Sequence, residues 1–333
     1  MNIKGKKVLV TGADGFIGSH LTERLIEEGA KVRAFCFYNS FGTNGWLDTL
    51  EKEKQNALDI FMGDIRDPHG VRTAMKNIDL VFHLAALIGI PYSYHSPDAY
   101  VDTNVKGTLN VLQAARELGG IPVVVTSTSE VYGTAQYVPI DELHPLNAQS
   151  PYAATKIAAD HLALSFYRSF NLPVRIARPF NAYGPRQSSR AIIPTIISQL
   201  LSGKSSIRLG NLLPTRDFTF VKDVANGFLA IAESDNAVGE VIHIGSQQEI
   251  SIKDLVLLLA RLMKKEEIEI EQQEERFRPE RSEVFRLYCN NEKIVQKASW
   301  HPQYTLEQGL QETIEWMAGN PSPNSYRAEI YHV

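Results

Sequence analysis

Tyr152 and Lys156 stand four residues apart in the run SPYAATKIAADH. This spacing places both side chains on one face of a helix. A free phenol has a pKa of about 10 and is a poor base at neutral pH, but a nearby ammonium stabilises the phenolate and lowers that pKa. The pair could therefore take a proton from a hydroxyl while a hydride leaves for a nicotinamide. An ordinary surface pair at this spacing is the structural alternative.

A second group of reactive side chains lies in TSTSEVYG, residues 126–133. The run before it, IPVVV, is typical of a buried strand, so Thr128, Ser129 and Glu130 would stand at the end of that strand. A carboxylate in a partly desolvated pocket has a raised pKa, which suits proton transfer near neutrality. A carboxylate that only caps a turn is the alternative interpretation.

The segment TGADGFIGSH follows the first predicted strand and begins the first predicted helix. Gly12 permits the tight turn, Gly15 lets the backbone approach a pyrophosphate, and Gly18 lets helix and strand pack closely. The N-terminus of the helix also favours a negative charge. Turns use glycine for other reasons too, but in this strand–turn–helix context the spacing predicts dinucleotide binding.

The second predicted strand ends in FCFYNS, without the acid that usually binds the ribose hydroxyls of NAD. Cys36, Tyr38 and Asn39 stand in that region instead. No lysine or arginine follows the strand to bind a 2′-phosphate, since Arg33 lies inside it, so NAD is favoured over NADP. Asp64, one strand later, is expected to face the adenine.

These residues stand on short Val- and Ile-rich runs that alternate with amphipathic helical patterns. That order predicts an α/β fold of the Rossmann type, a doubly wound parallel sheet covered on both faces, with a smaller α/β substrate domain after it. We expect the Rossmann domain over 1–180 and roughly 219–247, the substrate domain over roughly 181–218 and 248–320, and a tail over 321–333.

Two further patterns fall in the second half of the chain. Capping residues predict helix starts at Ser251 and Thr305. The run KKEEIEIEQQEE alternates through Ile268 and Ile270, so we interpret it as a solvated edge strand rather than an acidic interaction tail.

The bulk composition excludes several classes of protein. The 333 residues carry a formal net charge of −4, which gives no basic field for nucleic acid. The two cysteines, Cys36 and Cys289, do not indicate a disulfide framework. No apolar run is long enough to span a membrane, so a soluble cytoplasmic protein is expected. The nine histidines lack metal-binding spacing, so we expect no metal, and His83 is expected to pack at a strand end.

An ordered set of motifs runs over about residues 5 to 318. It resembles the extended short-chain dehydrogenase/reductases that act on nucleotide sugars, in particular the NAD-dependent amino-sugar 4,6-dehydratases of the legionaminic and pseudaminic acid pathways. The resemblance implies a tightly held NAD, a UDP-linked amino sugar as substrate, and a homodimer. The dimer would form a four-helix bundle from the helices at about 98–118 and 151–170. The motifs are TGADGFIGSH, FMGDIRD, HLAA, NVKGTLNVL, STSEVYG, PYAATK, RPFNAYGPR, RDFTFVKD and, near the C-terminus, RPERSEVFRLYCNN.

The resemblance also implies a role for each matched residue. In these dehydratases a hydride leaves sugar carbon 4, a Glu removes the proton on carbon 5, and a neighbouring Asp protonates the departing hydroxyl on carbon 6. Thr128 matches the hydroxyl that binds the carbon-4 oxygen, and Glu130 matches the carbon-5 base. The implied substrate-binding residues are Asn181, Arg216 and Arg278, with Arg281 as a less certain substitute. The implied cofactor-binding residues are Gly12, Gly15, Phe16, Ile17, Gly18, Tyr38, Asn39, Asp64, Ile65, Leu84, Ala85, Ala86, Tyr152, Lys156 and Pro179.

Ser129 departs from the Thr-Asp-Glu pattern of these dehydratases, because a serine hydroxyl is a far weaker acid than a carboxyl group. Three possibilities stay open. In the first, Glu130 takes the carbon-5 proton and then gives it to the leaving oxygen. In the second, the substrate is a 5,6-unsaturated amino sugar that loses no water. In the third, the chain is a UDP-glucuronate decarboxylase, a class that also carries Thr-Ser-Glu. A non-catalytic NAD sensor is a fourth alternative, and the set Thr128, Glu130, Tyr152 and Lys156 argues against it.

Overall fold

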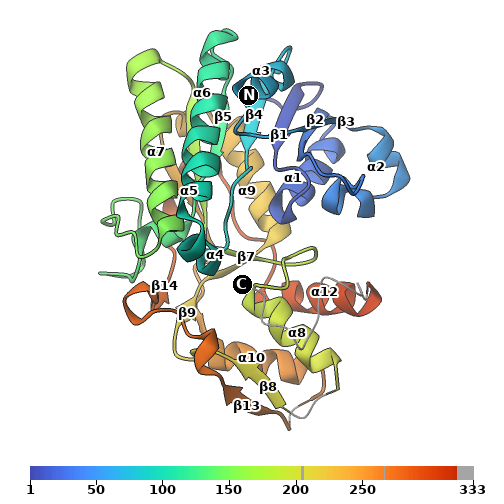
Figure 1. Ribbon diagram of the computed structural model, residues 1–333, viewed down its shortest axis with the longest axis vertical. Coiled ribbons are helices and arrows are strands. Elements are labelled where there is room, and N and C mark those ends of the chain that lie inside the picture. Colours follow the sequence, from blue (N-terminus) through green and yellow to red (C-terminus); the bar gives the residue numbers. More distant parts are fainter. Residues whose placement is uncertain (204–205, 266, 321–333) are drawn as a thin grey trace.

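The computed structural model describes residues 1–203, 206–265 and 267–320, and its centre is a seven-stranded parallel sheet (Figure 1). The strand order is β11-β6-β5-β4-β1-β2-β3. This confirms the predicted Rossmann-type fold. The strands are β1 (Lys7–Thr11), β2 (Lys31–Phe37), β3 (Asp59–Gly63), β4 (Leu80–His83), β5 (Val123–Thr126), β6 (Val174–Pro179) and β11 (Val241–Ile244).

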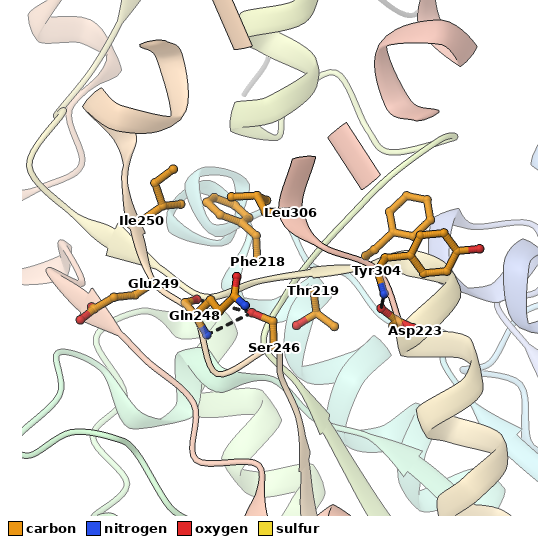
Figure 2. A pocket seen from close by; sticks show the side chains of 10 residues that line it. Phe218, Thr219, Asp223, Ser246, Gln248, Glu249, Ile250, Tyr304 and Leu306 are labelled. Atoms are coloured by element: carbon orange, nitrogen blue, oxygen red, sulfur yellow. Dashed lines mark hydrogen bonds between the residues drawn. The ribbon is translucent and has the colours of Figure 1, made fainter. Parts of the chain in front are cut away.

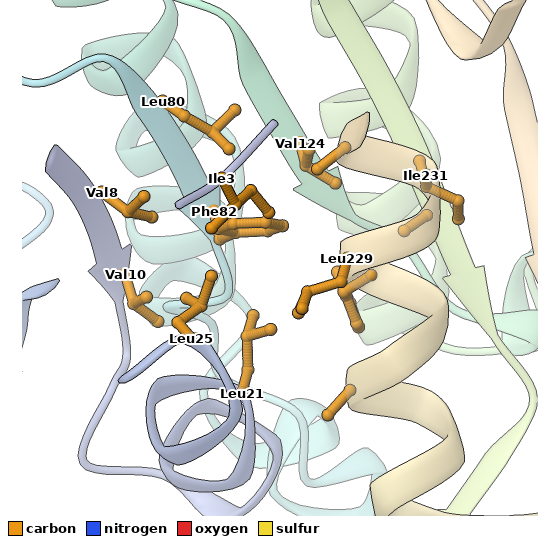
Figure 3. Packing of buried hydrophobic residues seen from close by; sticks show 14 of the residues in the cluster. Ile3, Val8, Val10, Leu21, Leu25, Leu80, Phe82, Val124, Leu229 and Ile231 are labelled. Carbon is orange, nitrogen blue, oxygen red and sulfur yellow. The ribbon is translucent and has the colours of Figure 1, made fainter. Parts of the chain in front are cut away.

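Helices cover both faces of this sheet, because successive strand side chains point to opposite sides. On one face Val8 and Val10 pack with Leu21 of α1 (Phe16–Glu27) and Phe228 of α9 (Val221–Glu233). Figure 3 shows this core between the two helices and the sheet. On the other face Leu9 joins the core formed with α3 (Pro68–Ala74), α6 (Gly107–Glu117) and α7 (Pro151–Phe170).

The helix before α6 has an unusual stretch. From α5 (Pro97–Tyr100) the chain continues through a π-helical segment, Val101–Lys106, directly into α6. The sequence predicts one helix over about 98–118, and the path is indeed helical throughout. Inside the π-helical segment, Asn104 donates to the carbonyl of Leu87 at 2.9 Å and accepts from the Leu87 amide at 2.8 Å. The wider turn thus fixes the loop after β4.

The second half of the chain forms a smaller α/β region that lies below the carboxyl ends of the main strands in Figure 1. It has its own apolar core, in which Ile196, Leu255 and Leu310 are fully buried. Ser251 caps a helix, and Thr305 with Gln308 forms a full capping box, as the sequence predicts. The helices are α8 (Ile192–Leu201), α10 (Ile252–Leu262) and α12 (Leu306–Gly319), and the strands are β7 (Asn181–Tyr183), β8 (Ser206–Leu209), β9 (Thr215–Arg216), β10 (Phe218–Phe220), β12 (Ile250–Ser251), β13 (Glu269–Gln272) and β14 (Arg286–Leu287).

The acidic run near residue 270 is a strand. β13 pairs with β8 in a two-stranded parallel sheet, and Ile268 and Ile270 pack against the core of the smaller region. The edge-strand prediction is therefore confirmed. The expected tail, 321–333, lies outside the described residues, and the division of the chain at about 181 and 248 stays our proposal. Within the described part of the chain, no helix is both long and apolar enough to cross a membrane.

Candidate active site

The glycine-rich turn is shaped by close backbone contacts. Gly12 has φ +70°, and a Cβ there would lie 2.8 Å from the amide nitrogen of Ala85. A Cβ on Gly18 would lie 2.0 Å from the carbonyl oxygen of Gly12. Gly15 is exposed and a Cβ on it would meet only the Gly12 oxygen, at 3.3 Å. The turn is therefore tight where helix meets strand and open where a pyrophosphate would approach, so these residues fit a dinucleotide.

The other residues of the predicted cofactor set gather at the carboxyl ends of the parallel strands, where ligands bind in open α/β sheets. Tyr38 follows β2, Asp64 and Ile65 follow β3, residues 84–86 follow β4, and Pro179 ends β6. Phe16 and Ile17 begin α1 and pack against the core of the smaller region. Each of these cofactor contacts stays a prediction.

Tyr152, Thr128 and Glu130 come together beside these strand ends. The Thr128 hydroxyl shares a hydrogen bond with the Tyr152 phenol and accepts another from the Glu130 amide at 3.2 Å. Burial raises the pKa of Tyr152, the hydrogen bond from Thr128 lowers it, and the nearby Glu130 carboxylate raises it further. The structure thus brings a phenol, a hydroxyl and a carboxylate to one point, the arrangement that the sequence predicts.

Lys156 follows Tyr152 by one turn of α7, as the sequence predicts. Its ammonium donates to the carbonyl oxygen of Thr126 at 2.5 Å. Burial lowers its pKa, which the Asp160 carboxylate partly offsets. The hydrogen bond to Thr126 holds the ammonium at the end of β5, and the effect of the ammonium on the Tyr152 phenol stays a prediction.

Glu130 is nearly buried in the 3₁₀ turn Ser129–Tyr132, and two arginines face it. Its Oε2 lies 4.0 Å from Nη1 of Arg278, too far for a hydrogen bond. That Nη1 is buried and has no hydrogen-bond partner among the described residues. Ser129 is also buried, with 2% of its surface exposed.

Arg216 ends β9 and is the more buried arginine. Burial lowers its pKa, and the carboxylates of Glu130 and Glu283 oppose that effect. Glu283 Oε1 lies 3.7 Å from its Nη2. Asn181, at the start of β7, has a buried Oδ1 without a hydrogen-bond partner in the described part of the chain. Nη1 of Arg278 is therefore a donor left over for a phosphate oxygen. Asn181 Oδ1 is an acceptor, so the phosphate contacts of Asn181 and Arg216 stay predictions, and the Arg281 side chain is exposed.

Gln149 and Ser282 connect the segment around Arg281 to the segment just after the Ser129–Tyr132 turn. No pattern in the sequence predicts this contact. Gln149 Nε2 donates to the carbonyl oxygens of Arg281 at 2.9 Å and Glu283 at 3.1 Å, while its Oε1 accepts from the Thr134 amide at 2.5 Å. Ser282 Oγ donates to the carbonyl of Gln149 at 2.6 Å. One side chain thus bonds both segments.

A buried polar network lies next to the Ser129–Tyr132 turn, and it was not predicted from the sequence. Asp160 Oδ2 accepts from Ser127 Oγ at 2.5 Å and from Arg178 Nη2 at 2.7 Å. Arg178 also donates to the Tyr132 hydroxyl, which lies 2.6 Å from His243 Nε2. The sequence feature that could have indicated this network is the position of Asp160, one helical turn after Lys156 on α7.

Two other features lie apart from this cluster. A cavity of about 140 Å³ shares no residue with the predicted site (Figure 2), and its walls include Thr219, Ser246 and Tyr304. Both ring nitrogens of His83 are bonded, to Thr11 at 2.8 Å and Thr108 at 3.0 Å. Over the described ranges, no group of three metal-ligating side chains occurs.

Comparison with known proteins finds similar structures over nearly the whole chain. Pal from Bacillus thuringiensis is 31% identical, with a TM-score of 0.82 over 94% of this chain and 99% of that one. UDP-N-acetylglucosamine 4-epimerase from Methanobrevibacter ruminantium M1, in complex with UDP-N-acetylmuramic acid, is 30% identical, with a TM-score of 0.84 over 95% and 99%. dTDP-glucose 4,6-dehydratase from Bacillus anthracis, in complex with NAD, is 30% identical, with a TM-score of 0.81 over 95% and 97%.

A family model described as GDP-mannose 4,6 dehydratase matches residues 9–313. Solved neighbours contain NAD, and the glycine-rich turn fits it, so NAD is the cofactor. The chain belongs to the GDP-mannose 4,6-dehydratase family of extended short-chain dehydrogenase/reductases, whose relatives here are NAD-dependent enzymes of nucleotide sugars.

Proposed function

We propose that the chain is a 4,6-dehydratase-type lyase that acts on a UDP-linked N-acetylhexosamine. The product would be a UDP-4-keto-6-deoxy amino sugar for the synthesis of pseudaminic or legionaminic acid. The observation that carries this proposal is the convergence of Tyr152, Thr128 and Glu130 at the strand ends. The solved neighbours that bind UDP-sugars support the choice of nucleotide.

The residues divide the chemistry among them. Bound NAD supplies the hydride acceptor. Tyr152 takes the proton of the carbon-4 hydroxyl, and Thr128 holds the oxygen through the hydroxyl that it shares with the phenol. Glu130 removes the carbon-5 proton, which the carbon-4 ketone has made acidic. Arg216 and Arg278 bind the diphosphate, because planar guanidinium groups pair well with phosphate oxygens.

The departing hydroxyl needs a proton, and Ser129 is a poor donor. In the proposed reaction Glu130 therefore acts twice, first as the base at carbon 5 and then as the acid that protonates the hydroxyl leaving carbon 6 as water. The hydride taken from carbon 4 would return to carbon 6 and a proton to carbon 5, which leaves the cofactor oxidised as before.

A second candidate follows from the same buried serine. A 5,6-unsaturated UDP-amino sugar could be oxidised at carbon 4, with the hydride delivered to carbon 6 and a proton from Glu130 to carbon 5. This conversion loses no water, so no acid at position 129 would be needed.

Liquid chromatography coupled to mass spectrometry separates the candidates, because the chromatography resolves compounds of equal mass. The purified enzyme is incubated with UDP-N-acetylglucosamine, with its 5,6-ene, and with UDP-glucuronate. Loss of one water from the first supports the dehydratase, and conversion of the second without change in mass supports the unsaturated substrate. Release of carbon dioxide from the third means a decarboxylase. No conversion of any of them by NAD-bound protein rejects the catalytic proposal in favour of a sensor.

We also propose that the enzyme is a cytoplasmic homodimer, formed by the faces of α6 and α7. The two helices pack side by side, and Val101 and Phe170, on the same helical paths, expose 43% and 45% of their surfaces. Two such pairs would form a four-helix bundle and cover these apolar side chains. Light scattering at micromolar concentration should give twice the mass of one chain, and a monomer would refute the proposal.

A further inference from the structure

The end of β2 is where Rossmann proteins usually carry the acid that binds the adenosine ribose. In this chain Asn39 stands in that region, and its amide is fully engaged by its own loop. Nδ2 donates to the carbonyl oxygens of Phe37 at 3.2 Å and Thr43 at 2.8 Å, and Oδ1 accepts from the Phe41 amide at 3.0 Å. The side chain of Asn39 therefore has no donor left for a ribose.

A carboxylate reaches the same place from the glycine-rich turn. Asp14 Oδ2 accepts from the amide of Phe37, the last residue of β2, at 3.2 Å. The loop after β2 folds back on Asp14, since the Trp46 amide donates to its carbonyl oxygen at 3.0 Å. Gly45 has no room for a side chain there, because a Cβ would lie 2.5 Å from that oxygen. Asp14 is thus held at the end of β2.

The negative charge of the Asp14 carboxylate receives little stabilisation from hydrogen bonds. No side chain in the described part of the chain donates a hydrogen bond to it. Burial raises its pKa, which the bond from Phe37 only partly offsets. A ribose offers two hydroxyl donors to such an anion, and hydrogen bonds to a charged acceptor are stronger than those between neutral groups.

Arg33 in β2 and Lys54 after it are already paired with carboxylates, so they are not available to bind a 2′-phosphate. Arg33, inside β2, donates to Asp59 at 2.6 Å. Lys54 is bonded to Glu23 at 2.8 Å and to Glu27 at 2.7 Å. A second carboxylate of the loop, Asp48, is bonded to Thr43 and Asn44.

We propose that Asp14 binds the adenosine-ribose hydroxyls of NAD and excludes NADP by repelling its 2′-phosphate. The acid that is absent from the end of β2 is thus supplied by the turn between β1 and α1. This assignment concerns the cofactor alone, so it stands or falls independently of the sugar that the enzyme converts.

The test is titration calorimetry of NAD and NADP on the full chain freed of bound nucleotide. Asp14→Asn keeps the shape of the side chain but removes its charge. NAD should bind about tenfold more weakly and NADP more tightly than in the wild type, so the NAD/NADP affinity ratio falls by more than about tenfold. A ratio within about twofold of the wild type would overturn the proposal.

A control variant and a modified nucleotide test the proposal further. Asp48→Asn removes a carboxylate from the same loop, and it should change NAD and NADP binding by the same factor. Wild-type protein should bind NAD about tenfold more tightly than NAD lacking the adenosine 2′-hydroxyl. Equal binding of these two nucleotides rejects the assignment, even if Asp14→Asn does not fold.

Discussion

Nη1 of Arg278 lies 4.0 Å from Oε2 of Glu130, so a group proposed to bind phosphate faces the group proposed to move a proton. The Arg278 side chain exposes 28% of its surface, and its Nη1 has no hydrogen-bond partner among the described residues. A diphosphate bound to Nη1 of Arg278 would therefore lie beside the Glu130 carboxylate.

Replacing Arg278 with Met should weaken substrate binding more than it slows the chemical step. A charge-assisted contact to phosphate is lost, and we expect KM to rise by about ten- to a hundredfold. Steady-state kinetics with the converted UDP-sugar measure this. Arg281→Met is the matched control, since that side chain is exposed, and it should change KM by less than about threefold. Equal effects of both substitutions would contradict the assignment of Arg278.

Tyr152→Phe should reduce kcat by about a hundred- to ten thousandfold, because it removes the group that accepts the carbon-4 proton. The phenol is buried and bonded to Thr128, so the ring should keep its place. Bound NAD, measured by absorbance after the protein is denatured, should be unchanged. Turnover at the wild-type rate would reject the assignment.

Glu130→Gln should stop exchange of the carbon-5 proton while oxidation at carbon 4 continues. The amide cannot accept the proton, yet it fills the same nearly buried space. Nuclear magnetic resonance in deuterated water follows the exchange, and absorbance of reduced nicotinamide follows the oxidation. Continued exchange in the variant would remove Glu130 from the role of base.

Asp217 should make stability depend on pH in an unusual direction. Burial raises its pKa to about 6 from 3.8, against hydrogen bonds from Ser246, Cys289 and Gln247. Between about pH 4 and pH 6 the folded protein therefore binds more protons than the unfolded chain, so stability falls as the pH rises through that window. From pH 4 to pH 7 the free energy of unfolding of the wild type should drop by about 2 to 3 kcal/mol relative to that of the Asp217→Asn variant.

Urea denaturation at several pH values measures this difference. Asp48 supplies the opposite control: burial tends to raise its pKa, but hydrogen bonds from Thr43 and Asn44 lower it. The wild type should therefore gain stability relative to Asp48→Asn as the pH rises through the acidic range. A difference from Asp217→Asn that grows with pH would contradict the prediction.

The sequence predicted the elements whose causes are local. Alternating strands and helices, the glycine turn and the capping box at Thr305 depend on neighbours a few residues away, and each is present. The convergence of Thr128 with Tyr152 was predictable because a strand end and a helix start were both recognisable.

Contacts between distant segments could not be predicted in this way. Arg178 lies inside an apolar strand, and its pairing with Asp160 depends on how β6 lies against α7. The direction of the Lys156 ammonium depends on the carbonyl of Thr126, which carries no sign in the sequence. Asn39 has a suitable position for the ribose, yet hydrogen bonds within its own loop occupy it.

The hydrogen bonds of Gln149 bear on which ligands the proposed site could bind. Its amide joins the backbone just after the Ser129–Tyr132 turn to the backbone around Arg281, so it holds together the segments that carry Glu130 and Arg278. If these two residues act as proposed, the site would favour molecules whose sugar ring and phosphates are spaced to reach both segments at once.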